Sequence, residues 1–435
     1  MIPNVKHLAC ASVVALSAAV GVAPMLKGAG PACDPDNGGL TLPSGFCAMV
    51  VADNLGAARH LAVAPNGDVY VALQRGPGAS GPGQGSPGGV VALHDGDGDG
   101  RFEVKEMIES TSTTGVALRN GYLYVAHPMN IQRYKMTPGQ LKPTGEPETI
   151  VTDLPPEQQH RDKGLAFDDH GSLYINVGAP SNACQQPDRR PGVKGVDPCP
   201  ILEKHAGIWK FDENKLGQKQ EDGTKFATGL RQMPAITWHD NAVYIVMNSR
   251  DSLDMFWPEK YTAKDNAERP AEPMYRAVQG SNFGWPYCYF DLSTKKLVLN
   301  PEYGGDGKEI GRCSQFTSPV VTFPAHWAPV DVMFYSGTLF PAKYQGGAFI
   351  AFHGSWNRAP MPQDGYNVTF QPFAAGKPSG DFEVFAKGFA GQDPLMSPND
   401  AVARADGVAQ APDGSLYVTD SQKGRIWRVM YTSKK

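Results

Sequence analysis

One acidic segment has the residue types and the spacing of a metal-binding loop. The sequence DGDGDGRFEVKE places carboxylates at Asp95, Asp97 and Asp99, has Gly100 where such a loop turns sharply, and ends at Glu106. Oxygen ligands at these positions are typical of a calcium loop. The VVALH segment before it reads as a strand and not as the helix of an EF-hand. We therefore interpret the segment as a structural calcium site between strands, and a solvated acidic turn is the alternative.

The cysteines predict disulfides and argue against a metal or haem site. Cys10 lies in an N-terminal apolar segment, and an even number of cysteines follows it. No CxxC pair, HExxH segment or CxxCH sequence occurs, so neither a zinc site nor covalently attached haem is expected. Cysteines that are close in the sequence can each staple one loop. The pairs that we expect on this ground are Cys33–Cys47, Cys184–Cys199 and Cys288–Cys313.

An internal repeat predicts the elements that position these groups. Each copy has an apolar strand, a turn rich in Asp, Asn and Gly, and a second apolar strand carrying Tyr. The copies are LAVAPNGDVYVAL from Leu61, GVALRNGYLYVAH from Gly115, GLAFDDHGSLYINVG from Gly164, AITWHDNAVYIVMN from Ala235, GVAQAPDGSLYVTDS from Gly407, and a looser one over Val330 to Ser355. The turns favour hairpins because Gly and Asn accept the positive φ that tight turns require.

About six hairpins predict an all-β fold, a six-bladed β-propeller. A single blade leaves apolar surface exposed, and closing a ring of blades covers it and protects the strand edges. We expect the last strand, Arg425 to Tyr431, to complete a blade begun by Phe46 to Val51. A stacked solenoid is the alternative, but the sequence has no polar capping repeats.

Composition and the first residues indicate an exported globular protein. The chain has 435 residues, 41% of them hydrophobic, and a net charge of −4, which gives no basic footprint for nucleic acid or an anionic membrane. Lys6 and an apolar run ending near Val22 resemble a signal peptide. We expect residues 1–32 to be the signal peptide and residues 33–435 to be one propeller domain, secreted or periplasmic, without stable membrane insertion. A retained membrane anchor is the alternative.

Six further motifs together resemble the soluble quinoprotein sugar dehydrogenases, most closely the glucose/sorbosone dehydrogenase group. They are HRDKGLAFDDHGSLYINVGAPSN from His160, GLRQ from Gly229, NSRDSLD from Asn248, FGWPYC from Phe283, HGSWNR from His353 and GVAQAPDGSLYVTD from Gly407. The resemblance covers the whole mature chain. It implies a propeller that binds pyrroloquinoline quinone (PQQ) and Ca²⁺ at the mouth of its channel and oxidises a sugar, a sorbosone-like aldehyde or a sugar alcohol by hydride transfer. Electrons would pass to an external acceptor, a cytochrome or the quinone pool.

The resemblance also implies roles for single residues. His160 stands at the family's base position, and Arg231 stands where the family's arginine faces the reactive quinone oxygen. The NSRD turn stands where the family holds its cofactor calcium, largely by backbone carbonyls. The calcium group would be Asn248, Ser249, Arg250 and Asp251, and the cofactor-binding candidates are Arg59, Lys163, Gln232, His353, Trp356, Arg358 and Arg404. Arginine suits carboxylates because its planar fork binds them bidentately.

Two departures and two other functions stay open. Gln232 stands where many relatives carry Asn, and Ala405 where Pro is common, so the substrate need not be glucose. A calcium-dependent sugar-lactone hydrolase and a non-catalytic, calcium-stabilised binding propeller share the ring architecture. The cationic set Arg231, Arg358 and Arg404 favours the dehydrogenase, because a neutral lactone does not need it.

Overall fold

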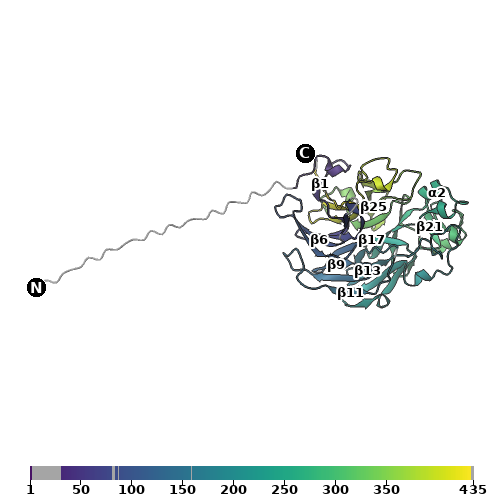
Figure 1. Cartoon of the computed structure of the whole chain (residues 1–435), viewed down its shortest axis with the longest axis horizontal. Helices are drawn as coiled ribbons and strands as arrows, with labels where there is room; N and C mark the ends of the chain where they lie inside the picture. The colour runs from purple at the N-terminus through teal and green to yellow at the C-terminus, as the bar shows by residue number, and fades with distance from the viewer. Residues whose placement is uncertain (2–30, 81–83, 87, 158, 433–435) are drawn as a thin grey trace.

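The protein is a six-bladed β-propeller, as the sequence predicts. The computed structural model describes residues 1, 31–80, 84–86, 88–157 and 159–432 (Figure 1). The innermost strands of the six sheets contact one another in a closed order, β2, β8, β12, β17, β24, β30 and back to β2. Apart from residues 1, 31 and 32, the predicted signal peptide lies outside the described residues, and so does Cys10.

Each blade is an antiparallel sheet whose strands run outward from the ring axis. Blade 1 contains β2 (Ala57–Val63), β3 (Val69–Gln74), β6 (Gly89–His94) and β7 (Val104–Glu109). Blade 2 contains β8 (Gly115–Arg119), β9 (Tyr122–Ala126), β10 (Ile131–Lys135) and β11 (Glu148–Thr152). Blade 3 contains β12 (Leu165–Phe167), β13 (Ser172–Val177), β14 (Gly207–Asp212) and β16 (Thr224–Thr228). Blade 4 contains β17 (Gln232–His239), β18 (Ala242–Asn248), β19 (Glu272–Ala277) and β23 (Val321–Phe323). Blade 5 contains β24 (Pro329–Phe334), β25 (Ala348–His353), β26 (Tyr366–Gln371) and β29 (Glu383–Ala386). Blade 6 contains β30 (Ala405–Gln410), β31 (Leu416–Asp420), β32 (Ile426–Tyr431) and β1 (Phe46–Ala52).

Shorter elements extend the blades or lie in the connections between strands. β15 (Gln218–Lys219) and β20 (Ser281–Asn282) add to blades 2 and 3. Separate hairpins are formed by β4 (Gly76–Ser80) with β5 (Gln84–Ser86), β21 (Cys288–Asp291) with β22 (Lys296–Leu299), and β27 (Phe373–Ala374) with β28 (Lys377–Pro378). α1 (Leu253–Phe256) and α2 (Ala263–Glu268) follow β18, and α2 lies near β21 at one edge of the molecule, to the right in Figure 1. The short 3-10 helices are Asn37–Gly39, Pro200–Glu203, Gln220–Asp222, Pro301–Tyr303, Gly311–Gln315, Ala342–Tyr344 and Pro398–Asp400.

The ring closes in blade 6, where the first described strand joins the last. β1 pairs antiparallel with β32, from Phe46 opposite Tyr431 to Ala52 opposite Ile426. The predicted closure is therefore confirmed. Six apolar clusters fill the spaces between neighbouring blades; Phe349 of blade 5 and Trp427 of blade 6, for example, share one of them. Burial between blades, and not within one blade, holds the ring together.

Glycine allows three inner strands to approach their neighbours closely. A Cβ atom at Gly115, Gly164 or Gly407 would overlap a backbone carbonyl oxygen of the next inner strand or of the segment just before it. These glycines begin the repeats that the sequence shows, so they mark places where only glycine fits.

The pairing is irregular at the start of four inner strands. The register shifts near Arg59 in β2, near Met233 in β17, near Val330 in β24 and near Asp406 in β30. Bulges of this kind re-aim side chains next to functional sites. Two of these shifts hold buried charged residues, Arg59 and Asp406, in strands that otherwise contribute to the apolar clusters.

The three predicted disulfides are all present. Sulfur atoms join Cys33 to Cys47, Cys184 to Cys199, and Cys288 to Cys313. Among the described residues, no helix is both long and apolar enough to cross a membrane.

Candidate functional site

A cavity of about 280 Å³ lies at one end of the propeller, where the chain enters the inner strands of blades 3 to 5. We call it the site cavity. Its lining contains the predicted residues His160, Arg231, Gln232, Asn248, Ser249, Asp251 and Trp356, together with Gln159, Arg189, Glu272, His326, Ala328 and Asn357. Residues predicted from separate motifs therefore meet in one place.

His160 is held as a neutral imidazole with one free nitrogen. Its Nδ1 lies 2.6 Å from the carbonyl oxygen of Ala179, and because a carbonyl only accepts, Nδ1 carries the proton. Its Nε2 makes no hydrogen bond with the described residues and is left for the cavity. Burial, together with the nearby charge of Arg231, lowers the pKa of His160 to about 3. The backbone of His160 is left-handed, with φ 55°, and Gly178 packs so closely on it that a side chain there would overlap.

Arg231 is a buried cation with one donor unused. Its guanidinium donates to the carbonyl oxygen of Ser249 at 2.7 Å and to Oδ2 of Asp251 at 2.5 Å, and the residue is only 2% exposed. Its Nε is buried without a hydrogen-bond partner. Arg189 also donates to Asp251, at 3.1 Å. Burial by itself would raise the pKa of Asp251, but the two guanidinium groups outweigh it and lower that pKa.

Oxygen atoms gather on the wall around the NSRD turn. Glu272 accepts a hydrogen bond from the Ser249 amide at 2.7 Å. Burial raises the pKa of Glu272 to about 8, and Asp251 adds to the rise, as expected where two carboxylates lie close together without enough positive charge. The side-chain amide of Asn248 donates a hydrogen bond to the Pro329 carbonyl oxygen at 2.6 Å. The Glu272 carboxylate, the Asn248 side-chain amide and backbone carbonyls are hard donors of the kind that Ca²⁺ prefers, and the Asp251 carboxylate lies beside them, paired with Arg189 and Arg231.

Arg250 departs from the rest of the NSRD turn. Its side chain turns away from the site cavity and donates to Glu302 at 2.6 Å and to Asn300 at 3.0 Å, in the buried interior. A guanidinium cannot ligate a cation, so only the backbone of Arg250 is available for the calcium group.

A second group of charged residues lies at the same end of the ring but does not line the site cavity. We call Arg59, Asp162, His353, Arg404 and Asp406 the Arg59 cluster. The Arg59 guanidinium lies 2.8 Å from Asp406 and 3.0 Å from Asp162, which joins blades 6, 1 and 3. His353 contacts the Ser421 hydroxyl at 2.6 Å, and Arg404 donates to the carbonyl oxygens of residues 353 and 354 at 2.9 Å and 2.7 Å. Three cofactor-binding candidates thus occur together here, with much of their hydrogen-bonding capacity used inside the protein.

The two remaining candidates are engaged elsewhere. Lys163 is fully buried and pairs with Glu157 at 3.0 Å. Arg358 donates to three backbone carbonyls, those of Ala267, Ala325 and Pro362. Neither side chain lines the site cavity. Arg358 instead braces the loop that presents Trp356 and Asn357.

Sequence reasoning missed five polar residues of the site cavity. Gln159 adjoins the motif that begins at His160, and Asn357 lies within HGSWNR, so their place could have been found from their neighbours. Arg189, Glu272 and His326 lie in long connections or at a strand start, without a repeat to align them. Only the fold brings these three to the cavity.

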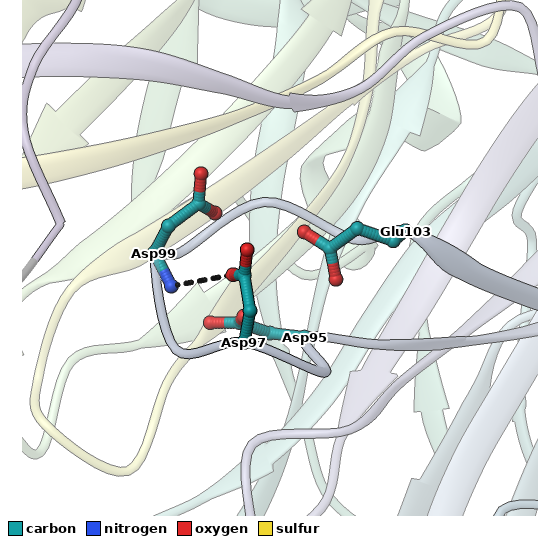
Figure 2. A group of neighbouring side chains, drawn as sticks. All are labelled: Asp95, Asp97, Asp99 and Glu103. Carbon is teal, nitrogen blue, oxygen red and sulfur yellow. Dashed lines mark hydrogen bonds between the residues drawn. The ribbon is translucent and has the colours of Figure 1, made fainter. Parts of the chain in front are cut away.

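The acidic loop differs from its predicted ligand set by one residue. Figure 2 shows Asp95, Asp97, Asp99 and Glu103 around one space, and their carboxylate oxygens lie within 4.8 Å of one another. Glu106 lies instead in β7, 3.5 Å from Lys142. No helix follows this loop, and a strand beginning at Val104 carries the last position of the motif away. Glu103 takes the place predicted for Glu106 beside the three aspartates.

Comparisons with known proteins place the chain in a larger group. A sequence model of the family described as TrAA12-like matches residues 40–432. A pyrroloquinoline quinone-dependent pyranose dehydrogenase of Coprinopsis cinerea is 27% identical over 274 residues, 54% of this chain and 36% of that protein. An uncharacterised protein of Borreliella burgdorferi is 26% identical over 278 residues, 63% of this chain and 61% of that protein. The matches therefore span less than two thirds of the length of these relatives.

Solved structures share the fold. The calcium structure of a Trichoderma reesei enzyme of carbohydrate-active family AA12 superposes with a TM-score of 0.71 at 18% identity, covering 90% of this chain and 97% of that one. The holo form of the pyranose dehydrogenase PQQ domain from Coprinopsis cinerea gives a TM-score of 0.68 at 18% identity, covering 92% of this chain and 98% of that one.

Proposed function

Because the chain belongs to the TrAA12-like family, we propose that it is a PQQ-dependent oxidoreductase that oxidises a CH–OH group of a sugar. One observation carries the proposal. The site cavity contains a neutral imidazole with a free nitrogen, His160, and a buried guanidinium, Arg231. Oxidation of an alcohol by hydride transfer requires a base for the hydroxyl proton and a cation near the atom that gains negative charge.

His160 Nε2 takes the hydroxyl proton, and Nδ1 stays bonded to the Ala179 carbonyl, which fixes the ring. Arg231, held by Ser249 and Asp251, cannot turn away from the cavity. PQQ, when bound, supplies the two-electron acceptor for the hydride. Arg189, the other cation that lines the cavity, would hold a cofactor carboxylate, with the exposed Trp356 at the rim.

Calcium belongs to the same proposal. Asp251, Glu272, the amide of Asn248 and backbone oxygens of the NSRD turn would hold the cofactor calcium. A second, structural calcium would occupy the loop formed by Asp95, Asp97, Asp99 and Glu103. The substrate would be a sugar, a sorbosone-like aldehyde or a sugar alcohol, and the electrons would leave to a cytochrome or to the quinone pool. The disulfides favour an oxidising compartment, and we propose that the protein is secreted or periplasmic.

Reconstitution of the purified protein tests the proposal. The protein is produced in an oxidising compartment, freed of metal with a chelator, and titrated with PQQ in the presence and absence of Ca²⁺ while absorbance is followed. Reduction of a dye is then measured with aldoses, sorbosone and sugar alcohols. We expect calcium-dependent PQQ binding and sugar-dependent dye reduction, and we expect Arg231→Ala to lose turnover.

A parallel assay of sugar-lactone hydrolysis separates the alternatives. Lactone hydrolysis with calcium but without PQQ, and no dye reduction, would make the protein a lactonase. Neither activity, with no PQQ binding, would leave a binding propeller.

A further inference from the structure

A second imidazole faces the site cavity from a wall that the proposed chemistry does not use. His326 lies in the connection before β24, is 5% exposed and lines the cavity. Its Nε2 lies 2.6 Å from the carbonyl oxygen of Asn266, so Nε2 carries the proton and donates. Its Nδ1 makes no hydrogen bond with any described residue. Because His326 lines the cavity, this acceptor nitrogen is left for a ligand there.

His326 and His160 are arranged in the same way with opposite ring nitrogens. His160 binds a carbonyl through Nδ1 and leaves Nε2 free, whereas His326 binds a carbonyl through Nε2 and leaves Nδ1 free. Both residues have left-handed backbones, with φ 55° and φ 63°. Such conformations persist only where the surroundings impose them, and they gather at functional sites.

The partner of His326, Asn266, is itself held by two side-chain hydrogen bonds. The Asn266 side chain accepts from the Leu253 amide at 3.0 Å and donates to the Asn357 carbonyl at 2.9 Å. Asn266 belongs to α2, Leu253 begins α1, and Asn357 lies beside Trp356 at the cavity rim. The imidazole of His326 is thus preorganised by elements that build the cavity wall.

Two other acceptor side chains on the cavity walls, Asp251 and Gln159, are engaged by groups of the protein itself. Asp251 accepts hydrogen bonds from Arg189, Arg231 and Asn357. Gln159 accepts from Arg189 at 3.0 Å. Burial lowers the pKa of His326, which keeps its ring neutral and its Nδ1 lone pair available. A ligand hydroxyl that enters the cavity therefore meets His326 Nδ1 as an unused acceptor.

We propose that His326 is a specificity-determining residue whose Nδ1 accepts a hydrogen bond from a second hydroxyl of the sugar while His160 faces the reacting hydroxyl. This inference rests on the proposed function. In the reaction, the reacting carbon gives its hydride to the quinone oxidant and its hydroxyl gives a proton to His160, leaving a carbonyl group. The second hydroxyl is bound and not consumed. The substrate class is therefore a sugar or polyol with at least two hydroxyl groups, and not a simple alcohol.

Two variants separate the two nitrogens of His326. His326→Gln keeps a donor near the position of Nε2 for the Asn266 carbonyl but removes the Nδ1 acceptor. His326→Asn keeps an oxygen near the position of Nδ1, tolerates the left-handed backbone, and removes the bond to Asn266. His326→Gln thus changes the proposed contact with substrate, and His326→Asn changes the structural contact with Asn266. Thermal unfolding measures the structural effect of each substitution.

Kinetics with deoxy sugars supply the first readout. D-glucose, D-galactose, D-mannose and D-xylose are compared with 2-deoxy and 3-deoxy analogues of whichever is oxidised fastest. We expect His326→Gln to lower kcat/KM for the parent sugar by about 10-fold, and to leave unchanged the value for one deoxy analogue that lacks the contacted hydroxyl. His326→Asn should retain most of the wild-type preference. PQQ affinity, measured by absorbance titration, should be the same in all three proteins.

Nitrogen-15 NMR of labelled histidine supplies a readout that does not depend on turnover. In the wild-type protein, the parent sugar should shift the Nδ1 resonance of His326, and the corresponding deoxy sugar should not. This measurement needs neither variant to fold. It also works on protein without PQQ.

The outcomes distinguish this inference from the proposed function. An Nδ1 resonance that no sugar moves, or equal losses for parent and deoxy sugars in His326→Gln, overturns the role of His326 while oxidation continues. A protein that binds sugar through His326 but neither binds PQQ nor reduces dye keeps this sugar contact and loses the proposed function. A change in PQQ affinity alone would assign His326 to the cofactor and overturn the inference.

Discussion

The site cavity and the Arg59 cluster lie at the same end of the ring and hold similar residue types, but they differ in what their charges face. In the Arg59 cluster, one guanidinium is shared by two carboxylates from different blades. In the site cavity, His160 Nε2 and His326 Nδ1 make no hydrogen bond with the described residues. Buried charges that satisfy one another link structural elements, whereas buried polar atoms left free beside a cavity are available for a ligand.

The largest effect should come from removing the base in the site cavity. His160→Asn retains a donor for the Ala179 carbonyl and accepts the left-handed backbone, but lacks Nε2. A positioned base typically contributes a factor of ~100 to ~10,000, so kcat of the reconstituted enzyme should fall by that amount. PQQ affinity and the midpoint of thermal unfolding should not change. Normal turnover in this variant would remove His160 from the role of base.

The next largest effect should come from the Arg59 cluster, and it should be on stability. Arg59→Met leaves Asp162 and Asp406 without their partner, and an unpaired buried charge costs about 3–5 kcal/mol of unfolding free energy. Arg312→Met is the matched control, because its pair with Asp197 is exposed and should contribute under ~1 kcal/mol. Urea unfolding of the two variants measures the difference. Equal, small losses would contradict a linking role for Arg59.

The loss in Arg59→Met should also depend on pH. Burial raises the pKa of Asp406 to about 7, while Arg59 and His60 lower it and Asp162 and Asp331 raise it. When a carboxyl has a higher pKa in the folded protein than in the unfolded chain, the protein loses stability as the pH rises from the unfolded-state pKa to the folded-state pKa. Removing Arg59 raises the folded value further. The variant should therefore be more destabilised, relative to wild type, at pH 8 than at pH 5, and an opposite trend in urea unfolding would contradict this assignment.

A smaller effect, on stability and site together, is expected from one disulfide. The double change Cys184→Ser, Cys199→Ser opens the loop that directly follows Asn182, which exchanges two hydrogen bonds with the backbone of Asp251. Loss of a short disulfide loop costs about 3 kcal/mol. PQQ binding should weaken as well. Opening Cys33–Cys47 in blade 6 should cost similar stability and leave PQQ affinity unchanged, so equal binding by both variants would argue against coupling of this loop to the site.

The smallest effect should come from the acidic loop, which contains no residue of either region. Calcium at a hundred times its dissociation constant should add about 2.7 kcal/mol of stability. Asp97→Ala and Glu103→Gln should each remove this gain, and Glu106→Gln should keep it, because Glu106 pairs with Lys142. Calorimetry with and without Ca²⁺ measures all four proteins. A gain that persists in Asp97→Ala would mean that the loop is a solvated acidic turn.

The fold could be predicted because each repeat is a short, continuous stretch of sequence. The site could be predicted only where its residues also belong to short, continuous motifs. Turns such as Asn120–Gly121 predict hairpins from residue type alone, because Asn and Gly accept the positive φ values of 50° and 78° found there. His160 and Arg231 were found through motifs beside inner strands. His326 and Glu272 belong to connections whose path depends on the whole ring. The predictions for the Arg250 and Glu106 side chains were wrong for local reasons. In the NSRD turn, successive side chains point in different directions, so the Arg250 side chain leaves the cavity. After the acidic loop, a strand stands where an EF-hand has a helix, and it carries Glu106 away from the aspartates.

The closure of blade 6 determines how the ring would respond to a pulling force. Phe46 at the start of β1 stands opposite Tyr431 at the end of β32. Tension applied at these two residues therefore loads the ladder one pair at a time, as in unzipping, and not all pairs together, as in shear. The clasp between β1 and β32 should open at low force, before blades 1 to 5 lose their contacts. A tether at either point would make blade 6 the mechanically weakest part of the ring.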